Sequence, residues 1–305
     1  MKYTIHVKSM IRDLASYLPK LKIVPGPVSK SEGISFVVPV KDEEKWIGAS
    51  LESIKEVADE IIVIDSSVED STTEIVASMA ENNSKIKHIR FYCPGPHAHA
   101  LACHIGLVNV SYKWVFKWDS DLIAKSTETL QTWKNRLNKL NKNTYYVIDI
   151  PSILLCGDLK HQPKTTQTQK PEAKIFTWSP ELKWQLKSNE NEQITGDSIY
   201  GHRFPPWYKI LQWNELYIFH CNIKTPERMV IRQYWSDYMK YKDKHLNLKD
   251  YAKYRLQKDS HTTLQEAMQT FKNNLAKTLI PYDEKTFGEL PKILLAQVLE
   301  PKKHT

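Results

Sequence analysis

Short apolar runs alternate with segments of helical spacing through the first half of the chain. Residues 34–40 and 61–64 are almost continuously apolar, as in strands that are buried on both faces of a parallel sheet. Each run is followed by apolar residues at helical spacing. The same alternation continues along the chain, and it predicts further strands near 88–92, 113–118 and 145–150 with helices between them.

This alternation predicts an α/β fold, built on an open and mostly parallel sheet with helices on both faces. We expect three parts: an N-terminal helix and linker in residues 1–33, the α/β domain in 34–225 and a helical extension in 226–305. The lysines and aromatic residues of the extension either cover a core or rest on a membrane surface, and covering a core is the favoured explanation.

The strand predicted at 113–118 carries an alternating aromatic pattern. Trp114, Phe116 and Trp118 fall on one face, and Val115 falls on the other. Two helix starts are also marked in the sequence. We expect Asp42 to cap the first helix, and we expect Ser71 with Glu74 to form a capping box for the second.

Acidic residues follow three of the predicted strands at the point where each strand ends. They are Asp42 and Glu43, Asp65, and Asp119 with Asp121. Ligands of open α/β sheets bind beyond the carboxyl ends of the strands, so these acids are expected to converge on one site. Two aspartates one residue apart can both turn outward and offer oxygen ligands to Mg²⁺ or Mn²⁺. Such an ion holds a diphosphate and neutralises it as it leaves.

Charge and missing motifs narrow the functional classes. The formal net charge of +8 favours contact with anions, such as nucleotide phosphates, an acidic polymer or an anionic membrane surface. The chain has no helix-turn-helix, zinc-finger or RNA-binding signature, so nucleic acid is not an expected partner. It has no Gly-x-Gly-x-x-Gly and no Gly-x-x-x-x-Gly-Lys-Ser/Thr, which argues against dinucleotide and P-loop enzymes.

The four cysteines and the hydropathy pattern indicate a location. None of the cysteines forms a Cys-x-x-Cys pair, so we expect reduced, mostly buried thiols and no thiolate zinc site. No apolar run approaches the ~20 residues of a membrane span, and the N-terminus lacks the apolar core of a secretory signal. We therefore expect a cytoplasmic protein that contacts a membrane only at its surface, if at all.

Three segments in order resemble the family 2 glycosyltransferases. They are ISFVVPVKDEEK at 34–45, EIIVIDSSVEDST at 60–72 and FKWDSD at 116–121. The resemblance covers residues 34–122 well and 140–225 more loosely. It implies the A-type glycosyltransferase fold, a single Rossmann-like α/β domain, and a metal-dependent enzyme that transfers a sugar from a nucleotide-sugar donor, usually with inversion at the anomeric carbon.

The resemblance also assigns roles to residues of the three segments. The donor is a UDP- or GDP-sugar, and the metal is Mn²⁺ or Mg²⁺. The residues matched to the nucleotide sugar are Pro39, Val40, Asp42, Glu43, Asp65, Lys117 and Asp119, with Asp65 at the base. The residues matched to the metal are Asp119, Asp121 and, at a later strand end, His220. For His220, contact with a phosphate and a buried structural role are alternatives.

The sequence departs from the family pattern in the third helix. Many relatives carry Arg-Asn-Ile-Gly where this chain has Cys103-His-Ile-Gly, so an arginine that touches phosphate is missing. His97, His99 or His104 substitutes for it, or the site is altered. The favoured explanation of these histidines is that they belong to a polar loop and a helix surface. A protein that binds a nucleotide sugar or a glycan without catalysis is therefore the alternative function. A nucleotidyltransferase is disfavoured, because no Gly- and Lys/Arg-rich phosphate loop is evident near residues 38–46.

An inverting transfer needs a base that removes the proton of the acceptor hydroxyl. Relatives place this acid after a strand that contains aromatic residues. Glu190, Glu192 and Asp197 are the candidates here, and the sequence leaves the choice among them open. The expected acceptor is a glycan, a polysaccharide or a lipid-linked sugar.

Overall fold

The computed structural model describes most of the chain. The described residues are 13–27, 30–92, 98–169, 173–186, 192–195, 204–215, 218–240 and 247–299. Of the expected N-terminal helix, residues 13–15 are helical and 1–12 lie outside the described residues. The boundaries expected at 33 and 225 remain predictions.

A seven-stranded sheet forms the centre of the α/β domain. Its strands, in spatial order, are β13 (Tyr208–Gln212), β6 (Tyr145–Asp149), β10 (Ala173–Thr177), β4 (Tyr112–Lys117), β1 (Ser31–Val40), β2 (Glu60–Asp65) and β3 (Ile86–Arg90). β10 runs antiparallel to both of its neighbours, and the other pairs are parallel. The predicted α/β class with a mostly parallel sheet is confirmed.

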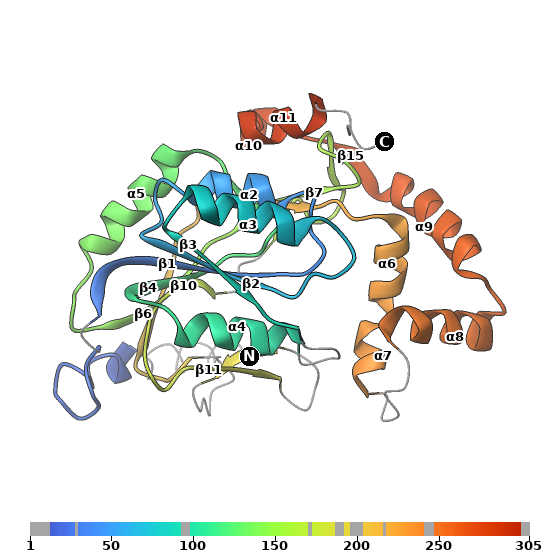
Figure 1. Ribbon diagram of the computed structural model, residues 1–305. Helices are drawn as coiled ribbons and strands as arrows, with labels where there is room; N and C mark the ends of the chain where they lie inside the picture. The colour runs from blue at the N-terminus through green and yellow to red at the C-terminus, as the bar shows by residue number, and fades with distance from the viewer. Residues whose placement is uncertain are drawn as a thin grey trace.

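Helices cover both faces of this sheet (Figure 1). Lying on one face are α2 (Ile47–Ile54), α3 (Thr72–Asn82) and α5 (Thr127–Asn138), and on the other is α4 (Ala98–Val108). The predicted alternation in β4 explains how one strand serves both layers. Trp114, Phe116 and Trp118 are buried in the core beneath α2 and α5, whereas Val115 is buried in the core beneath α4.

A smaller sheet continues from the end of β4. Its order is β5 (Leu122–Ala124), β14 (Ile218–Asn222), β7 (Ser152–Cys156) and β9 (Thr168–Gln169). β14 pairs antiparallel with β5 and parallel with β7. Because β4 ends at Lys117 and β5 starts at Leu122, the Asp119-Ser-Asp121 segment forms the connection between the two sheets.

The C-terminal region is mostly helical, as predicted. Its elements are α6 (Pro226–Gln233), α7 (Trp235–Lys240), α8 (Leu248–Ser260), α9 (Leu264–Thr278), β15 (Leu279–Pro281), α10 (Glu284–Phe287) and α11 (Lys292–Leu299). The strand β15 was not predicted, and it pairs with β8 (His161–Pro163). Helices α6 to α9 stand together beside the sheets, and α10 and α11 lie apart from them (Figure 1). Within the part of the chain that the structure describes, no helix is long and apolar enough to span a bilayer.

Both capping expectations are wrong. Helix α2 begins at Ile47 and its N-cap is Trp46, because Asp42 turns away with a left-handed φ of 51°. The Asp42 carboxylate instead accepts the backbone N–H groups of Val68 and Glu69, at 2.9 and 3.0 Å. Ser71 is the N-cap of α3, but its side chain makes no capping hydrogen bond. Asp42 therefore ties the loop after β1 to the loop after β2.

Candidate functional site

The link between the two sheets brings Asp121 against the end of β14. The backbone oxygen of Asp121 accepts the N–H of Cys221 at 2.9 Å, which fixes this segment beside β14. The Asp121 carboxylate then lies 3.3 Å from the ring nitrogen Nε2 of His220 and 2.9 Å from Nζ of Lys224. The expectation that both aspartates turn outward is wrong for Asp121, which is only 7% exposed. Asp119 is more exposed, and it pairs with Lys117.

Lys224 joins two carboxylates that come from different parts of the sequence. Its Nζ lies 2.5 Å from Glu43 and 2.9 Å from Asp121, and its side chain is only 5% exposed. Arg228 of α6 also pairs with Glu43 at 2.8 Å and donates to the backbone oxygens of Lys41 and Asp42. The loop after β1, the sheet junction and the start of α6 are thus held together by one set of ion pairs, in which Glu43, Asp121 and Lys224 are buried and Arg228 is more exposed.

Burial and pairing act against each other on the two carboxylates. Burial raises the pKa of Asp121, but the hydrogen bond from His220 and the charges of His220 and Lys224 outweigh it and hold the pKa well below its usual range. For Glu43 burial dominates, so its pKa is raised despite the charges of Lys224 and Arg228. The groups around Asp121 therefore favour its ionised form, whereas burial disfavours that of Glu43.

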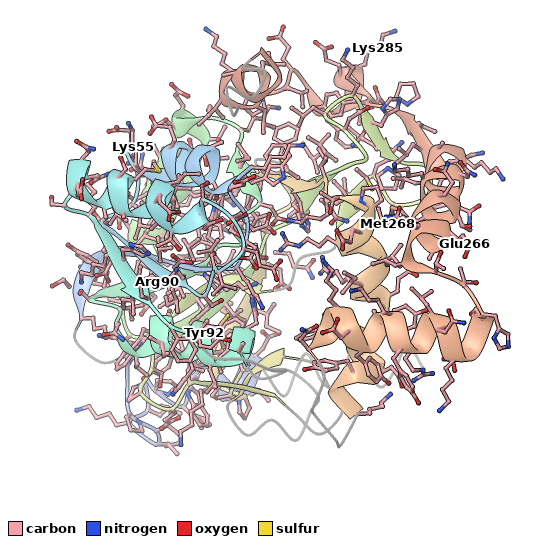
Figure 2. The ribbon with its side chains drawn as sticks, turned by 45° about the vertical axis from the view of Figure 1, so that its right-hand side comes forward. Lys55, Arg90, Tyr92, Glu266, Met268 and Lys285 are labelled. Carbon is pink, nitrogen blue, oxygen red and sulfur yellow. The ribbon has the colours of Figure 1, made fainter. Side chains whose placement is uncertain are left out.

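Asp65 lies at the end of β2 and is fully buried. One carboxylate oxygen accepts the N–H of Ser67 at 2.8 Å. The other lies 3.0 Å from His88 and 2.6 Å from Arg90, both on β3. Figure 2 labels Arg90 on this strand. Burial works to raise the pKa of Asp65, but these hydrogen bonds outweigh it and the pKa is lowered.

We expect Asp65→Asn to lower the free energy of unfolding by about 1–3 kcal/mol at pH 7, because it weakens hydrogen bonds to a buried charged group. Since the pKa of Asp65 is lowered on folding, its contribution is full above its unfolded value of about 3.9 and is lost as the pH falls further. Urea unfolding of the wild type and the variant at pH 7 and pH 3 measures this. The difference between their free energies of unfolding should be smaller at pH 3.

Glu52→Gln, in an exposed pair with Lys55, is the control and should change stability little at either pH. A difference between wild type and Asp65→Asn that is equal at both pH values contradicts the account.

The remaining residues of the first predicted segment have structural contacts. Pro39 and Val40 are buried and pair in register with Ile64 and Asp65 of β2. The carboxylates of Asp42 and Glu43 are engaged with protein groups, as described above. The end of the strand and the two acids are therefore fixed by contacts within the protein. Their assignment to the nucleoside remains a prediction.

Residues of other elements can supply the positive charge of the missing arginine. Burial lowers the pKa of His99 on α4 to about 4, and the charges of Lys117 and Arg232 act in the same direction. His99 is therefore neutral at pH 7. His104 instead lies 3.4 Å from the backbone N–H of Trp184, against β11 (Lys183–Leu186), and His97 lies outside the described residues. The positive charge at Asp121 and Glu43 comes from His220, Lys224 and Arg228, and sequence reasoning did not single out the last two.

The candidate bases fall on a stretch that is only partly described. Glu190 and Asp197 lie outside the described residues. Glu192 begins β12 (Glu192–Thr195), which pairs with β11, and only its backbone is described. The choice of the base remains a prediction.

A divalent cation at the Asp119-Ser-Asp121 segment is implied by the resemblance. The donor types fit, because carboxylate oxygens and an imidazole suit Mn²⁺, and the 3.3 Å between Asp121 and His220 is a spacing that two ligands of one ion can have. Both carboxylates are paired with ammonium groups in the structure, Asp119 with Lys117 and Asp121 with Lys224. Among the described residues, no group of three or more His, Cys, Asp or Glu side chains is placed to hold a metal. A cation would therefore have to displace these lysines from the carboxylates.

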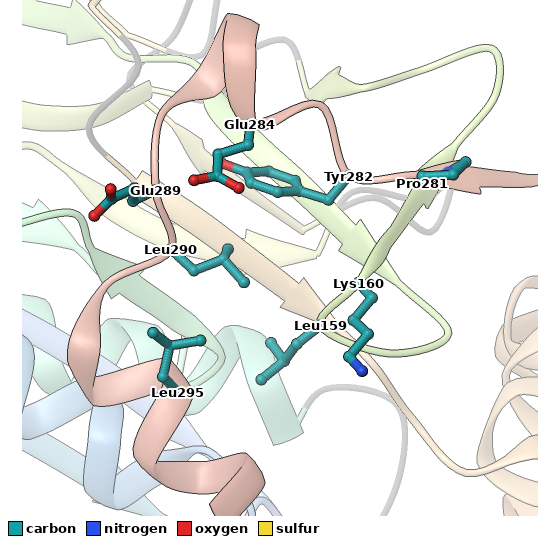
Figure 3. A pocket seen from close by; sticks show the side chains of 8 residues that line it. All are labelled: Leu159, Lys160, Pro281, Tyr282, Glu284, Glu289, Leu290 and Leu295. Carbon is teal, nitrogen blue, oxygen red and sulfur yellow. The ribbon is translucent and has the colours of Figure 1, made fainter.

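Two cavities lie near the smaller sheet. One, of about 310 Å³, is bordered by Asn222 and Lys224 and so adjoins the ion pairs. The other, of about 370 Å³, lies between the loop around Leu159 and the segment that carries α10 and α11 (Figure 3). Tyr282 and Leu295 line it, and none of the predicted site residues does. The candidate site is therefore the edge that carries Asp65, Asp121 and Lys224.

The family model "Glycosyl transferase family 2" matches residues 35–199, more than half of the 305-residue chain. The chain belongs to glycosyl transferase family 2. The match includes the three segments on which the resemblance rested, apart from Ile34, and it identifies the α/β domain as a glycosyltransferase domain of the A type. No curated protein sequence matches the chain.

Solved structures of glycosyltransferases show weaker likeness. S. aureus TarS 1-349 is 16% identical over 75% of this chain and 73% of its own, with a TM-score of 0.42. The same fragment in complex with UDP-GlcNAc aligns over 40% of this chain and 35% of its own, at 22% identity and a TM-score of 0.34. Glucosyl-3-phosphoglycerate synthase from Mycobacterium tuberculosis, in complex with Mn²⁺ and UDP, is 22% identical over 41% of this chain and 44% of its own, with a TM-score of 0.30. The chain thus covers only about a third of the length of the TarS fragment that was solved with UDP-GlcNAc.

Proposed function

We propose that this family 2 protein transfers a sugar from a UDP- or GDP-sugar to a hydroxyl of a glycan or a lipid-linked acceptor, with inversion at the anomeric carbon. The observation that carries the proposal is the convergence at one sheet edge of Asp121, His220 and Lys224, next to the loop of Glu43. Ionised carboxylates and cations side by side are the groups that a sugar nucleotide diphosphate requires.

In this proposal Asp119, Asp121 and His220 hold Mn²⁺ or Mg²⁺. The ion, when bound, supplies positive charge to the departing diphosphate. Lys224 then keeps its bond to Glu43, and Arg228 holds the same carboxylate in place. Lys117 and Lys224, once displaced from the aspartates, remain near enough to contact phosphate oxygens.

Asp65 and the loop after β1 bind the nucleoside in this proposal. Both oxygens of Asp65 already accept hydrogen bonds, so a base adds to an existing arrangement. Arg90 is about half exposed in its side chain and accompanies Asp65 at this edge. One of Glu190, Glu192 and Asp197 removes the proton of the acceptor hydroxyl as the new bond forms.

We also propose that the protein works in the cytoplasm, with any membrane contact at its surface. The support is the burial of its cysteines: Cys103, Cys156 and Cys221 are buried thiols, as expected of an intracellular protein. We propose the same three-part division as before: an N-terminal arm, a catalytic domain in 34–225 and a C-terminal helical extension.

A thermal-shift panel of UDP- and GDP-sugars, each with Mn²⁺, with Mg²⁺ and with a chelator, tests the function. A ligand at a hundred times its Kd stabilises the folded state by about 2.7 kcal/mol, which raises the melting temperature by several degrees. We expect one nucleotide class to do this, and only in the presence of metal. If none of the nucleotide sugars shifts the melting temperature, the donor class is wrong. A bound donor without any transfer or hydrolysis would instead favour the non-catalytic binding protein.

A further inference from the structure

Strand β14 and the residue pair after it present an alternating polar row to the site. Phe219, Cys221 and Ile223 are buried in the core of the smaller sheet. The alternate residues His220, Asn222 and Lys224 share the opposite face, and the side chain of Lys224 is more buried than that of His220. Since His220 and Lys224 both contact Asp121, Asn222 lies between two groups of the candidate site.

Asn222 has an unsatisfied acceptor. Its side-chain oxygen Oδ1 is buried and finds no hydrogen-bond partner among the residues that the structure describes. A buried polar atom without a partner costs about 1–3 kcal/mol, which a ligand that donates a hydrogen bond would recover. Asn222 borders the cavity of about 310 Å³, and Lys224 borders it as well. The cavity therefore continues from the site of the proposed reaction.

The opposite wall of this cavity is mostly apolar. Its apolar residues are Met229 of α6, Phe271, Leu275 and Ala276 of α9, and Leu279, and the charged Lys272 and Asp158 border the cavity as well. Gly157 lets the loop after β7 pass close beneath this wall, because at its φ of +81° a Cβ atom would lie 2.6 Å from Leu279. The space thus has one polar side, at Asn222 and Lys224, and one apolar side.

Helix α9 has apolar surface that the protein does not cover. Its 15 residues include no buried residue, although Leu264, Met268, Phe271 and Leu275 form an apolar stripe. These four are half-buried. Met268 and Glu266 lie on opposite sides of the helix, with Met268 toward α6 (Figure 2). An apolar ligand group in the cavity would cover the part of the stripe at Phe271 and Leu275.

We propose that this cavity binds the acceptor, and that the acceptor is an amphiphilic alcohol. Its apolar body packs against Phe271, Leu275 and Met229. A hydroxyl of its polar end donates to Oδ1 of Asn222 next to Lys224, once the Asn222 side chain turns this buried atom toward the cavity. The volume is within the range of small-molecule sites. The inference rests on the proposed function and names the acceptor class for that same reaction.

Titration calorimetry of the full chain with octyl β-D-glucoside, below its micelle concentration, tests the proposal. Methyl β-D-glucoside shares the sugar but lacks the apolar body, so it should bind at least tenfold more weakly. Leu275→Glu, which places a charge on the apolar wall, should weaken binding of the octyl glucoside at least tenfold. Asn222→Leu should weaken it severalfold, because the donor hydroxyl loses its acceptor.

Leu295→Glu is the matched control, since Leu295 is 45% exposed and lines the other cavity. It should leave binding of octyl glucoside unchanged, and circular dichroism should show the same melting for all variants. The inference is overturned if octyl glucoside does not bind the wild type, or if Leu275→Glu binds it as well as Leu295→Glu does. UDP and GDP are titrated in parallel with Mn²⁺. If a nucleotide binds and octyl glucoside does not, the acceptor inference alone fails; if neither nucleotide binds, the proposed function fails.

Discussion

Asp121→Asn should lower kcat by about 10²–10³-fold, equivalent to about 3–4 kcal/mol of transition-state stabilisation. The substitution keeps the size of the side chain but removes the charge that faces His220 and Lys224. In our proposal this charge holds the cation that neutralises the departing diphosphate. Release of UDP or GDP from the donor in a steady-state assay measures the effect.

The same substitution should also cost stability, because Asp121 is buried and paired. Removing one partner of a buried pair costs about 3–5 kcal/mol in general, and the loss here should fall at or below that range since Lys224 keeps Glu43. Urea unfolding of each variant shows whether the assay was made on folded protein. Asp119→Asn, which changes the more exposed aspartate, separates the two effects: it should lose activity with less loss of stability. Full activity in both variants, or activity that a chelator does not change, would defeat the metal model.

Glu190→Gln is expected to lower kcat by about 10²–10⁴-fold while leaving the Kd of the donor nearly unchanged. A sugar hydroxyl is a poor nucleophile at pH 7, so a carboxylate must accept its proton as the bond to the anomeric carbon forms. Glutamine has nearly the same size but does not accept that proton. The loss therefore falls on the transition state, at about 3–5 kcal/mol.

Two further variants decide whether Glu190 is the right acid. Glu192→Gln and Asp197→Asn are measured beside it, each for kcat and for donor affinity. If Glu190→Gln turns over normally and Asp197→Asn does not, the base lies on the later loop. If none of the three changes turnover, the inverting mechanism itself is in doubt.

The order of β1 to β4 and β6, with the helices between them, followed directly from hydrophobic patterning. β1 and β2 are buried on both faces, and a strand of this kind appears in the sequence as a short, nearly continuous apolar run. The alternation in β4 was also informative, because its two faces belong to two different cores. By contrast, β15 is three residues long with half-buried and exposed positions, too little for a periodic signal.

The acids of the site were visible in the sequence, but their partners were not. Asp65 and Asp121 stand at strand ends, which patterning locates. Lys224 pairs with Glu43, 181 residues earlier in the chain, and such a pairing depends on how β14 packs beside β5. One signal was available: His220, Lys224, Arg228 and Arg232 recur every four residues around the start of α6. Helical spacing places Arg228 and Arg232 on one side of α6.

The most direct test of the central claim is a calorimetric titration of the chain with UDP-GlcNAc, UDP-glucose and a GDP-sugar in Mn²⁺. The account predicts that one of them binds the wild type, that Asp65→Asn weakens this binding, and that Asp121→Asn or a chelator abolishes its metal-dependent part. Glu52→Gln should bind like the wild type, because its carboxylate is in an exposed pair on α2. No binding of any of these nucleotide sugars, or binding that is the same in the Asp65 and Asp121 variants as in the wild type, would contradict the account.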